Sequence, residues 1–284
     1  MRRPIVAFIA IAYSLSIALS LLVALTGGNQ SAFTGVGFAA MFVPTIAVVL
    51  VLSMTRERLG IDWRRLPVTF LPLALLMIPV TLHAAMLAVM RGVGPLPWAT
   101  WLTPSSDGLY HTPESQGWGV LTAQGLVFRM LVNAAVGVVV VSALALFEEI
   151  GWRGWLLPQL MRRMSARRAV VAASMIWALW HVPFGLSGVQ HIDGVSPVRV
   201  ALLVAFGTVA AGLVIGWLWV RTESIWIAAI AHGALNNWGQ YAFKFMEDFA
   251  VPDQSVVLGA GFVALYGLGT VLLAFGTSSE RTMS

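Results

Sequence analysis

Long apolar segments alternate with short polar connections along the whole chain. A helix needs about 20 residues to cross the roughly 30 Å of hydrocarbon in a bilayer. Eight segments approach or exceed that length, at residues 4–26, 34–54, 66–90, part of 121–161, 169–187, 198–220, 224–242 and 255–275. The pattern predicts an all-α, polytopic membrane helical bundle of about eight transmembrane helices, which forms a single domain over residues 1–284.

The beginning of the chain has the order of a signal peptide, with Arg2 and Arg3 before an apolar run. That run is longer than the apolar core of a signal peptide, so we expect a retained first helix. Composition agrees with a membrane protein, because 58% of the residues are hydrophobic and 10% are charged, against about a quarter charged in soluble domains. The chain has no cysteine, which excludes disulfide bonds.

Basic residues are distributed unevenly between the two sides of the predicted bundle. With eight spans, one side receives Arg2, Arg3, Arg56, Arg58, Arg64, Arg65, Arg162, Arg163, Arg167, Arg168, Arg221 and Arg281, and the other receives Arg91, Arg199 and Lys244. Because basic loops stay in the cytoplasm, the distribution predicts a multi-pass protein of the cell membrane with both termini cytoplasmic. Insertion orientation accounts for these charges, so we expect the lipid bilayer, and no nucleic acid, as a partner.

Ionisable side chains inside membrane spans are costly and therefore indicate function. The apolar segments contain His83, Arg129, Glu148, Glu149, Arg153, His181 and His232, with the uncharged Asn236 and Asn237. At about 1.5 Å per helical residue, His181 lies roughly 20 Å beyond Arg168. By the same measure, His232 lies roughly 14 Å beyond Glu223. Both histidines are therefore expected near the middle of the bilayer.

The depth of the two glutamates depends on how residues 121–161 cross, because one helix of that length would be about 60 Å long. If residues 127–147 span the bilayer, the glutamates lie at its inner edge. If roughly 137–158 span it, the glutamates lie deep and residues 121–136 are interfacial. We favour the deep placement, since a buried carboxylate needs partners and the histidines offer them.

Helical spacing groups these side chains further, because residues four apart share a face and neighbours diverge by about 100°. Glu149 and Arg153 are positioned to pair, whereas Glu148 points elsewhere without a local counter-charge. His232 and Asn236 project together from their own helix. The spacing thus predicts one glutamate that is structural and one that is available for chemistry.

This set of residues suits the hydrolysis of an amide without a covalent nucleophile. Glu148 beside His181 would deprotonate a water, and His232 with Asn236 would donate hydrogen bonds to a developing oxyanion. No cofactor is then needed. In the alternative, the Glu148, His181 and His232 side chains bind a zinc ion, although the HExxH helix of membrane metalloproteases is absent.

Three short motifs in the same region carry a family resemblance. The stretch EEIGWR at 148–153 resembles the EExxxR motif of the CPBP family, the CAAX-processing and bacteriocin-processing intramembrane endopeptidases also called ABI. WALWH at 177–181 is similar to the second motif, FxxxH, with Trp177 in place of Phe, and HGALN at 232–236 is similar to the third, HxxxN. The resemblance covers roughly residues 140–240.

The resemblance implies an intramembrane protease acting on a peptide or membrane-protein substrate. Glu148 and His181 would activate water, His232 and Asn236 would form the oxyanion site, and Glu149 with Arg153 would support them. Members of the family have been described both as glutamic and as metal-dependent proteases. We expect the physiological setting to be maturation of a secreted peptide or self-immunity.

Two other interpretations compete with this one. GLSG at 185–188 matches the GxSG of rhomboid-type serine proteases, but Ser187 would lie about 15 Å from the depth of His232, too far for a nucleophile and its base. We interpret GLSG as the turn that ends a helix. A non-catalytic bacteriocin-immunity protein or a proton-coupled transporter remains an alternative, and it would tolerate Glu148→Gln where a protease would not.

Overall fold

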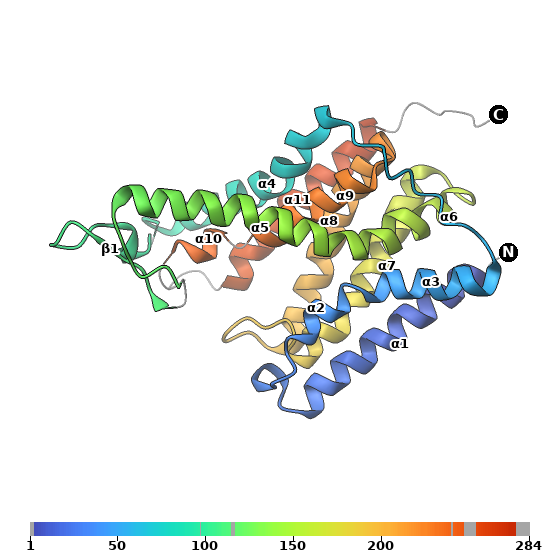
Figure 1. Cartoon of the computed structure of the whole chain (residues 1–284), viewed down its shortest axis with the longest axis horizontal. Helices are drawn as coiled ribbons and strands as arrows, with labels where there is room; N and C mark the ends of the chain where they lie inside the picture. Colours follow the sequence, from blue (N-terminus) through green and yellow to red (C-terminus); the bar gives the residue numbers. More distant parts are fainter. Residues whose placement is uncertain (1–2, 97, 115–116, 240, 247–253, 277–284) are drawn as a thin grey trace.

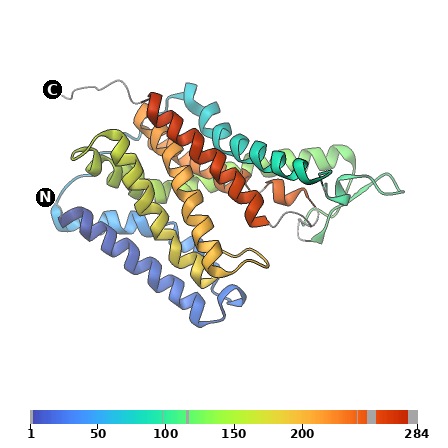
Figure 2. The same cartoon turned by 180° about the vertical axis from the view of Figure 1, so that it is seen from behind.

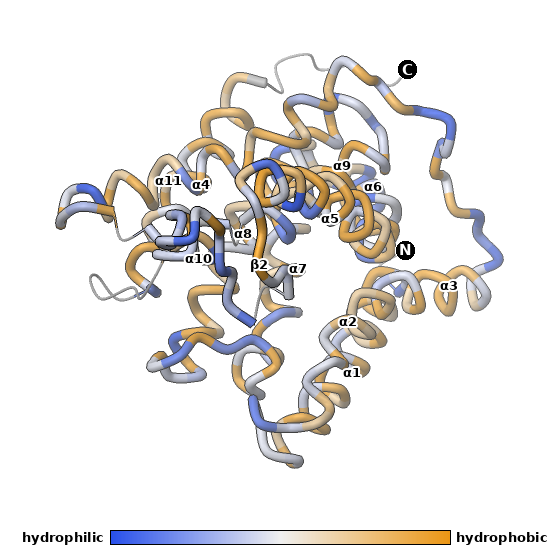
Figure 3. The backbone as a smooth tube through the Cα atoms, turned by 60° about the vertical axis from the view of Figure 1, so that its left-hand side comes forward, coloured by the Kyte–Doolittle hydropathy of each residue, from blue (hydrophilic) through white to orange (hydrophobic). Residues whose placement is uncertain are grey.

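The computed structural model describes residues 3–96, 98–114, 117–239, 241–246 and 254–276, which form the bundle of helices in Figure 1. The helices are α1 (Arg3–Leu25), α2 (Val36–Ala40), α3 (Val43–Thr55), α4 (Leu71–Val93), α5 (Ala123–Gly151), α6 (Leu157–Met161), α7 (Ala166–Ser187), α8 (Pro197–Thr222), α9 (Ile225–Trp238), α10 (Tyr241–Lys244) and α11 (Gln254–Gly276). Two short strands, β1 (Tyr110–His111) and β2 (Val120–Leu121), pair in antiparallel fashion in the connection before α5. Hydrophilic stretches are concentrated in the connections, and the helices are largely apolar (Figure 3).

Seven helical segments of the described chain are long and apolar enough to cross a membrane, which confirms the polytopic helical bundle. They are Arg3–Leu25, Val36–Thr55, Val68–Val93, Ala123–Met161, Ala166–Ser187, Pro197–Thr222 and Gln254–Phe275. The eighth expected span, at 224–242, is instead the 14-residue helix α9, which rises only about 21 Å. Asn236, Asn237 and Gly239 favour helices weakly, and α9 ends among them.

Residues 123–161 form one continuous helical segment, which contains both of the shorter spans considered for this region. A π-helical turn at Trp152–Leu156 joins α5 to α6. Pro158 has no N–H to offer the carbonyl four residues before it, which accounts for a distorted turn at this place. The two glutamates precede the turn and are buried inside the bundle, whereas much of the first half of α5 is exposed. Both glutamates are therefore enclosed by neighbouring helices, and their deep placement in the bilayer stays a prediction.

Small residues let the helices around the glutamates approach closely. α5 packs against α9, and α7 packs against α8. A Cβ on Gly233 of α9 would come within 2.1 Å of Ser142 on α5, and one on Gly212 of α8 within 2.5 Å of Ser174 on α7. Larger side chains would push these pairs apart, which is the usual role of small residues between membrane helices.

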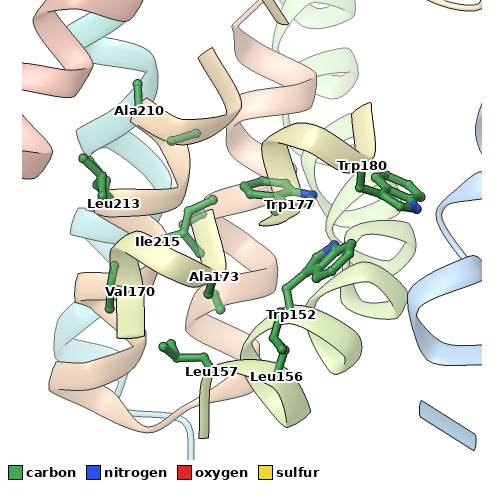
Figure 4. Packing of buried hydrophobic residues seen from close by; sticks show 14 of the residues in the cluster. Trp152, Leu156, Leu157, Val170, Ala173, Trp177, Trp180, Ala210, Leu213 and Ile215 are labelled. Atoms are coloured by element: carbon green, nitrogen blue, oxygen red, sulfur yellow. The ribbon is translucent and has the colours of Figure 1, made fainter. Parts of the chain in front are cut away.

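An aromatic cluster fills the core beside the close-packed helices (Figure 4). Trp152, Trp177 and Trp180 are each at most 2% exposed. The rings of Trp152 and Trp180 lie 5.7 Å apart, and Phe8 of α1 meets Trp152 edge-on at 5.5 Å. The Trp180 indole donates to the carbonyl of Ala12, so α1 is tied to α7 by both packing and a hydrogen bond. This cluster gives the site a rigid support on one side.

Candidate active site

The residues singled out by the sequence come from three helices that meet in the interior. The end of α5 and the π-turn supply Glu148, Glu149 and Arg153. Helix α7 supplies Trp177 and His181, and α9 supplies His232 and Asn236. The close approach of α5 and α9 at Gly233 brings the first and third groups together.

Glu149 is the centre of a fully buried charged group. Its Oε1 accepts from Arg153 Nη1 at 2.8 Å and lies 2.9 Å from His232 Nδ1. The exposed fractions of the Glu149, Arg153 and His232 side chains are 0%, 2% and 3%. Arg153 also lies over the Trp177 ring, 4.3 Å from its centroid, and donates to the Gly212 carbonyl at 3.5 Å. The pair expected from the spacing of Glu149 and Arg153 is present, and it reaches His232 on a second helix.

Glu148 is held by two indoles instead of by a cation. Its Oε2 accepts from Trp177 Nε1 at 2.9 Å and from Trp152 Nε1 at 3.4 Å. The residue is 4% exposed, and within the described chain it forms no ion pair shorter than 4.0 Å. These two donors hold the carboxylate in place and leave its other oxygen for a further contact.

Sequence reasoning did not assign Trp152 and Trp177 a part in the site. A signal for both was available, because a buried indole N–H needs an acceptor and few acceptors exist in an apolar span. Trp152 lies four residues after Glu148, on the same helical face. Trp177 occupies the aromatic position of the second motif, where its N–H provides the hydrogen bond that a Phe would lack.

The ring nitrogens of both histidines are distinguished by their partners. His181 Nδ1 lies 3.1 Å from the Trp177 carbonyl oxygen, which can only accept, so Nδ1 carries a proton. Nδ1 of His232 faces the Glu149 carboxylate and by the same reasoning carries a proton. In a neutral ring, Nε2 of each histidine is then an acceptor.

The four residues expected to be catalytic line one cavity of about 560 Å³. Glu148, His181, His232 and Asn236 contribute to its wall, together with apolar side chains from α2, α4, α7, α8, α9 and α11. His232 is buried, whereas Asn236 is exposed to the cavity. Glu149 and Arg153 do not line the cavity and lie behind His232. Glu148, His181, His232 and Asn236 therefore line the cavity, and Glu149 and Arg153 lie behind them.

The described residues do not provide a ready metal site. Within them, no three His, Cys, Asp or Glu side chains are grouped so that they could hold a metal ion. In particular, Glu148, His181 and His232 do not form such a group as they are placed.

The remaining polar residues of the apolar segments lie elsewhere. Ser187 is the last residue of α7 and donates to the Phe184 carbonyl at 3.1 Å, and Gly188 follows with φ +87°. GLSG therefore ends a helix, as expected, and does not present a nucleophile to His232. Arg129 is exposed on α5.

A polytopic membrane bundle with a cluster of ionisable residues around an internal cavity is the class of protein that the fold and the site define. Comparison with known proteins specifies the class further. The family model described as Type II CAAX prenyl endopeptidase Rce1-like matches residues 131–238. That segment contains all three motifs, so the match covers the region in which the chain resembles the family.

The chain is also similar to a curated protein over part of its length. CAAX prenyl protease 2 of Methanococcus maripaludis is 28% identical over 125 residues, which cover 43% of this chain and 46% of the relative. The chain therefore spans about half the length of the curated relative that it matches.

Proposed function

We propose that the chain is an intramembrane endopeptidase that hydrolyses a peptide bond with a water activated by Glu148 and His181. The observation that carries the proposal is the meeting of Glu148, His181, His232 and Asn236 on one internal cavity, with Glu149 and Arg153 behind them. The match of residues 131–238 to an endopeptidase family supports the reaction class.

The water would bind between the Glu148 carboxylate and His181 Nε2. The two indoles occupy Oε2 of Glu148, so Oε1 is the oxygen that accepts the proton of the water. The hydroxide forms a bond to the carbonyl carbon of the scissile peptide, and the carbonyl oxygen takes the electron pair as an oxyanion. Glu148 then returns the proton to the leaving nitrogen as the C–N bond breaks.

His232 and Asn236 would stabilise the oxyanion from the other side. Because Nδ1 of His232 donates to Glu149, its Nε2 can donate to an oxyanion only when the ring is an imidazolium. The carboxylates of Glu148 and Glu149 and the guanidinium of Arg153 together carry one net negative charge. Protonation of one histidine makes this cluster of side chains neutral. Glu149 holds the His232 ring through Nδ1, and the Asn236 amide supplies a second, uncharged donor.

The substrate we propose is a peptide or membrane protein whose scissile bond can enter an apolar cavity within the bilayer. The name of the curated relative makes a prenylated CAAX peptide the first substrate to test. Maturation of a secreted peptide or self-immunity is the proposed physiological setting.

The test of the proposed function is the product formed by the purified chain from prenylated CAAX peptides and from a general peptide library, with and without a chelator. We expect a single cleaved bond, identified by mass spectrometry, at a rate that the chelator does not change. Loss of cleavage that only zinc restores would contradict the water–Glu148 mechanism. Tight binding of peptides without any product would instead support the non-catalytic alternative.

We propose in addition that both termini lie in the cytoplasm of a cell-membrane protein, which requires the chain between α8 and α11, with the short helix α9, to return across the bilayer as an eighth crossing. The basic connection before α4 contacts the connection after α8, through a 2.7 Å ion pair between Arg65 and Glu223. Arg167 near the start of α7 donates to Ala274 at the end of α11, so basic connections gather at one end of the bundle. Arg2 and Arg281, also assigned to that side, lie outside the described residues. A periplasmic-only reporter fused after Ser284 is expected to stay silent, and activity there would reject the topology.

A further inference from the structure

A second hollow lies on the outside of the bundle, between α7, α8 and α11. Helix α8 packs against both α7 and α11, which are seen on either side of it in Figure 2. The hollow has a volume of about 630 Å³ and shares no lining residue with the cavity of the candidate active site. Its lining side chains are apolar except at a few positions, and Val171, Met175 and Leu179 of α7 are each more than 40% exposed.

The hollow runs from the basic end of the bundle to about the middle of the membrane. Its lining on α7 extends from Arg167 to Leu179, which is about 18 Å along the helix axis. One leaflet accounts for half of the roughly 30 Å of hydrocarbon, or about 15 Å. The rings of Phe206 and Tyr266, 5.7 Å apart, lie at the deep end. The hollow therefore has the depth of a single leaflet.

The shallow end of the hollow carries a basic side chain. Arg167 lines it and reaches from α7 to the Ala274 carbonyl of α11. A guanidinium has five N–H donors and can contact more than one acceptor at once. Arg162, Arg163 and Arg168 lie in the same seven-residue stretch, and the sequence has no acidic residue between Glu149 and Asp193. The one acidic side chain of the neighbouring α8–α9 connection, Glu223, is paired with Arg65.

We propose that this hollow, the α7–α8–α11 groove, binds one acyl chain of an anionic phospholipid whose phosphate lies against Arg167. The apolar walls of leaflet depth accept the chain, and Arg167 at the mouth selects a negatively charged headgroup. The inference is independent of the proposed protease activity, because the groove lies on the outer face of α7 and the candidate active site on its inner face.

The experiment is a titration of the purified full-length chain with phosphatidylglycerol and with phosphatidylcholine, in which native mass spectrometry measures binding of the first lipid. We expect phosphatidylglycerol to bind more tightly by roughly fivefold or more, the effect of one basic group at a membrane surface. Arg167→Gln is expected to remove this preference. The matched control is Arg168→Gln, which removes the same charge from the next position outside the groove and is expected to keep most of the preference.

A second pair of variants separates lipid binding from folding. Arg167→Lys keeps the charge and is expected to keep the preference. Ala205→Phe places a ring in the groove and is expected to weaken binding of both lipids several-fold while their ratio changes little. Equal binding of the two lipids by the unmodified chain would overturn the proposal. An equal loss of the phosphatidylglycerol preference in Arg167→Gln and Arg168→Gln would also overturn it. If Arg167→Gln does not fold, the comparison of Arg167→Lys with Ala205→Phe decides in its place.

Discussion

Glu148→Gln is expected to lower peptide cleavage per folded molecule by ~10²–10⁴-fold, the usual cost of losing a general base. The amide keeps the shape of the side chain, and its oxygen can still accept from the Trp177 and Trp152 indoles. It cannot take a proton from water. Because a buried negative charge disappears, the melting temperature in detergent is expected to stay the same or to rise. Cleavage rate and thermal unfolding of the same preparation are the two measurements.

Trp177→Phe provides the graded control for this prediction. It keeps an aromatic ring over Arg153 but removes the stronger of the two indole donors to Glu148. The carboxylate remains and is less well positioned, so activity is expected to fall less than in Glu148→Gln. A folded Glu148→Gln protein with normal activity would contradict the assignment of the base, and it would favour the immunity or transport interpretation.

The parts of the site that depend on local helix geometry could be predicted from the sequence. The Glu149–Arg153 pair follows from a spacing of four residues, and the shared cavity wall of His232 and Asn236 follows from the same rule. The membrane bundle follows from the length of the apolar segments. In each case the information lies within one helix.

The parts that depend on how helices pack could not be predicted in the same way. The contact between Glu149 and His232 joins residues 83 positions apart and requires the close approach of α5 and α9 at Gly233. The Trp177 donor to Glu148 depends on the rotation of α7 toward α5, whereas the Trp152 donor lies on the same helical segment as Glu148. The length of the expected eighth span was wrong for a different reason. Hydropathy counts apolar residues, but it does not show that α9 ends near its two asparagines.

The contact with His232 changes what Glu149→Gln is expected to do. The free energy of unfolding is expected to fall, because the substitution leaves the Arg153 guanidinium buried without its paired carboxylate. Breaking such a pair from one side costs ~3–5 kcal/mol. The cleavage rate is expected to fall as well, because the Gln oxygen can still accept from His232 Nδ1 but carries no negative charge to balance an imidazolium. We therefore expect both a lower melting temperature and a lower cleavage rate per folded molecule.

Arg153→Met separates these two effects. Alone, it leaves the Glu149 carboxylate buried without its cation and is expected to destabilise the protein by a similar amount. Combined with Glu149→Gln, it removes both charges, and the double variant is expected to be more stable than the sum of the two single losses predicts. Activity should not recover with stability, because His232 still lacks the carboxylate that accepts from its Nδ1. Strict additivity of the stability losses would show that the pair is not coupled. Full activity of the folded double variant would show that His232 acts without Glu149, and would remove the imidazolium from the mechanism.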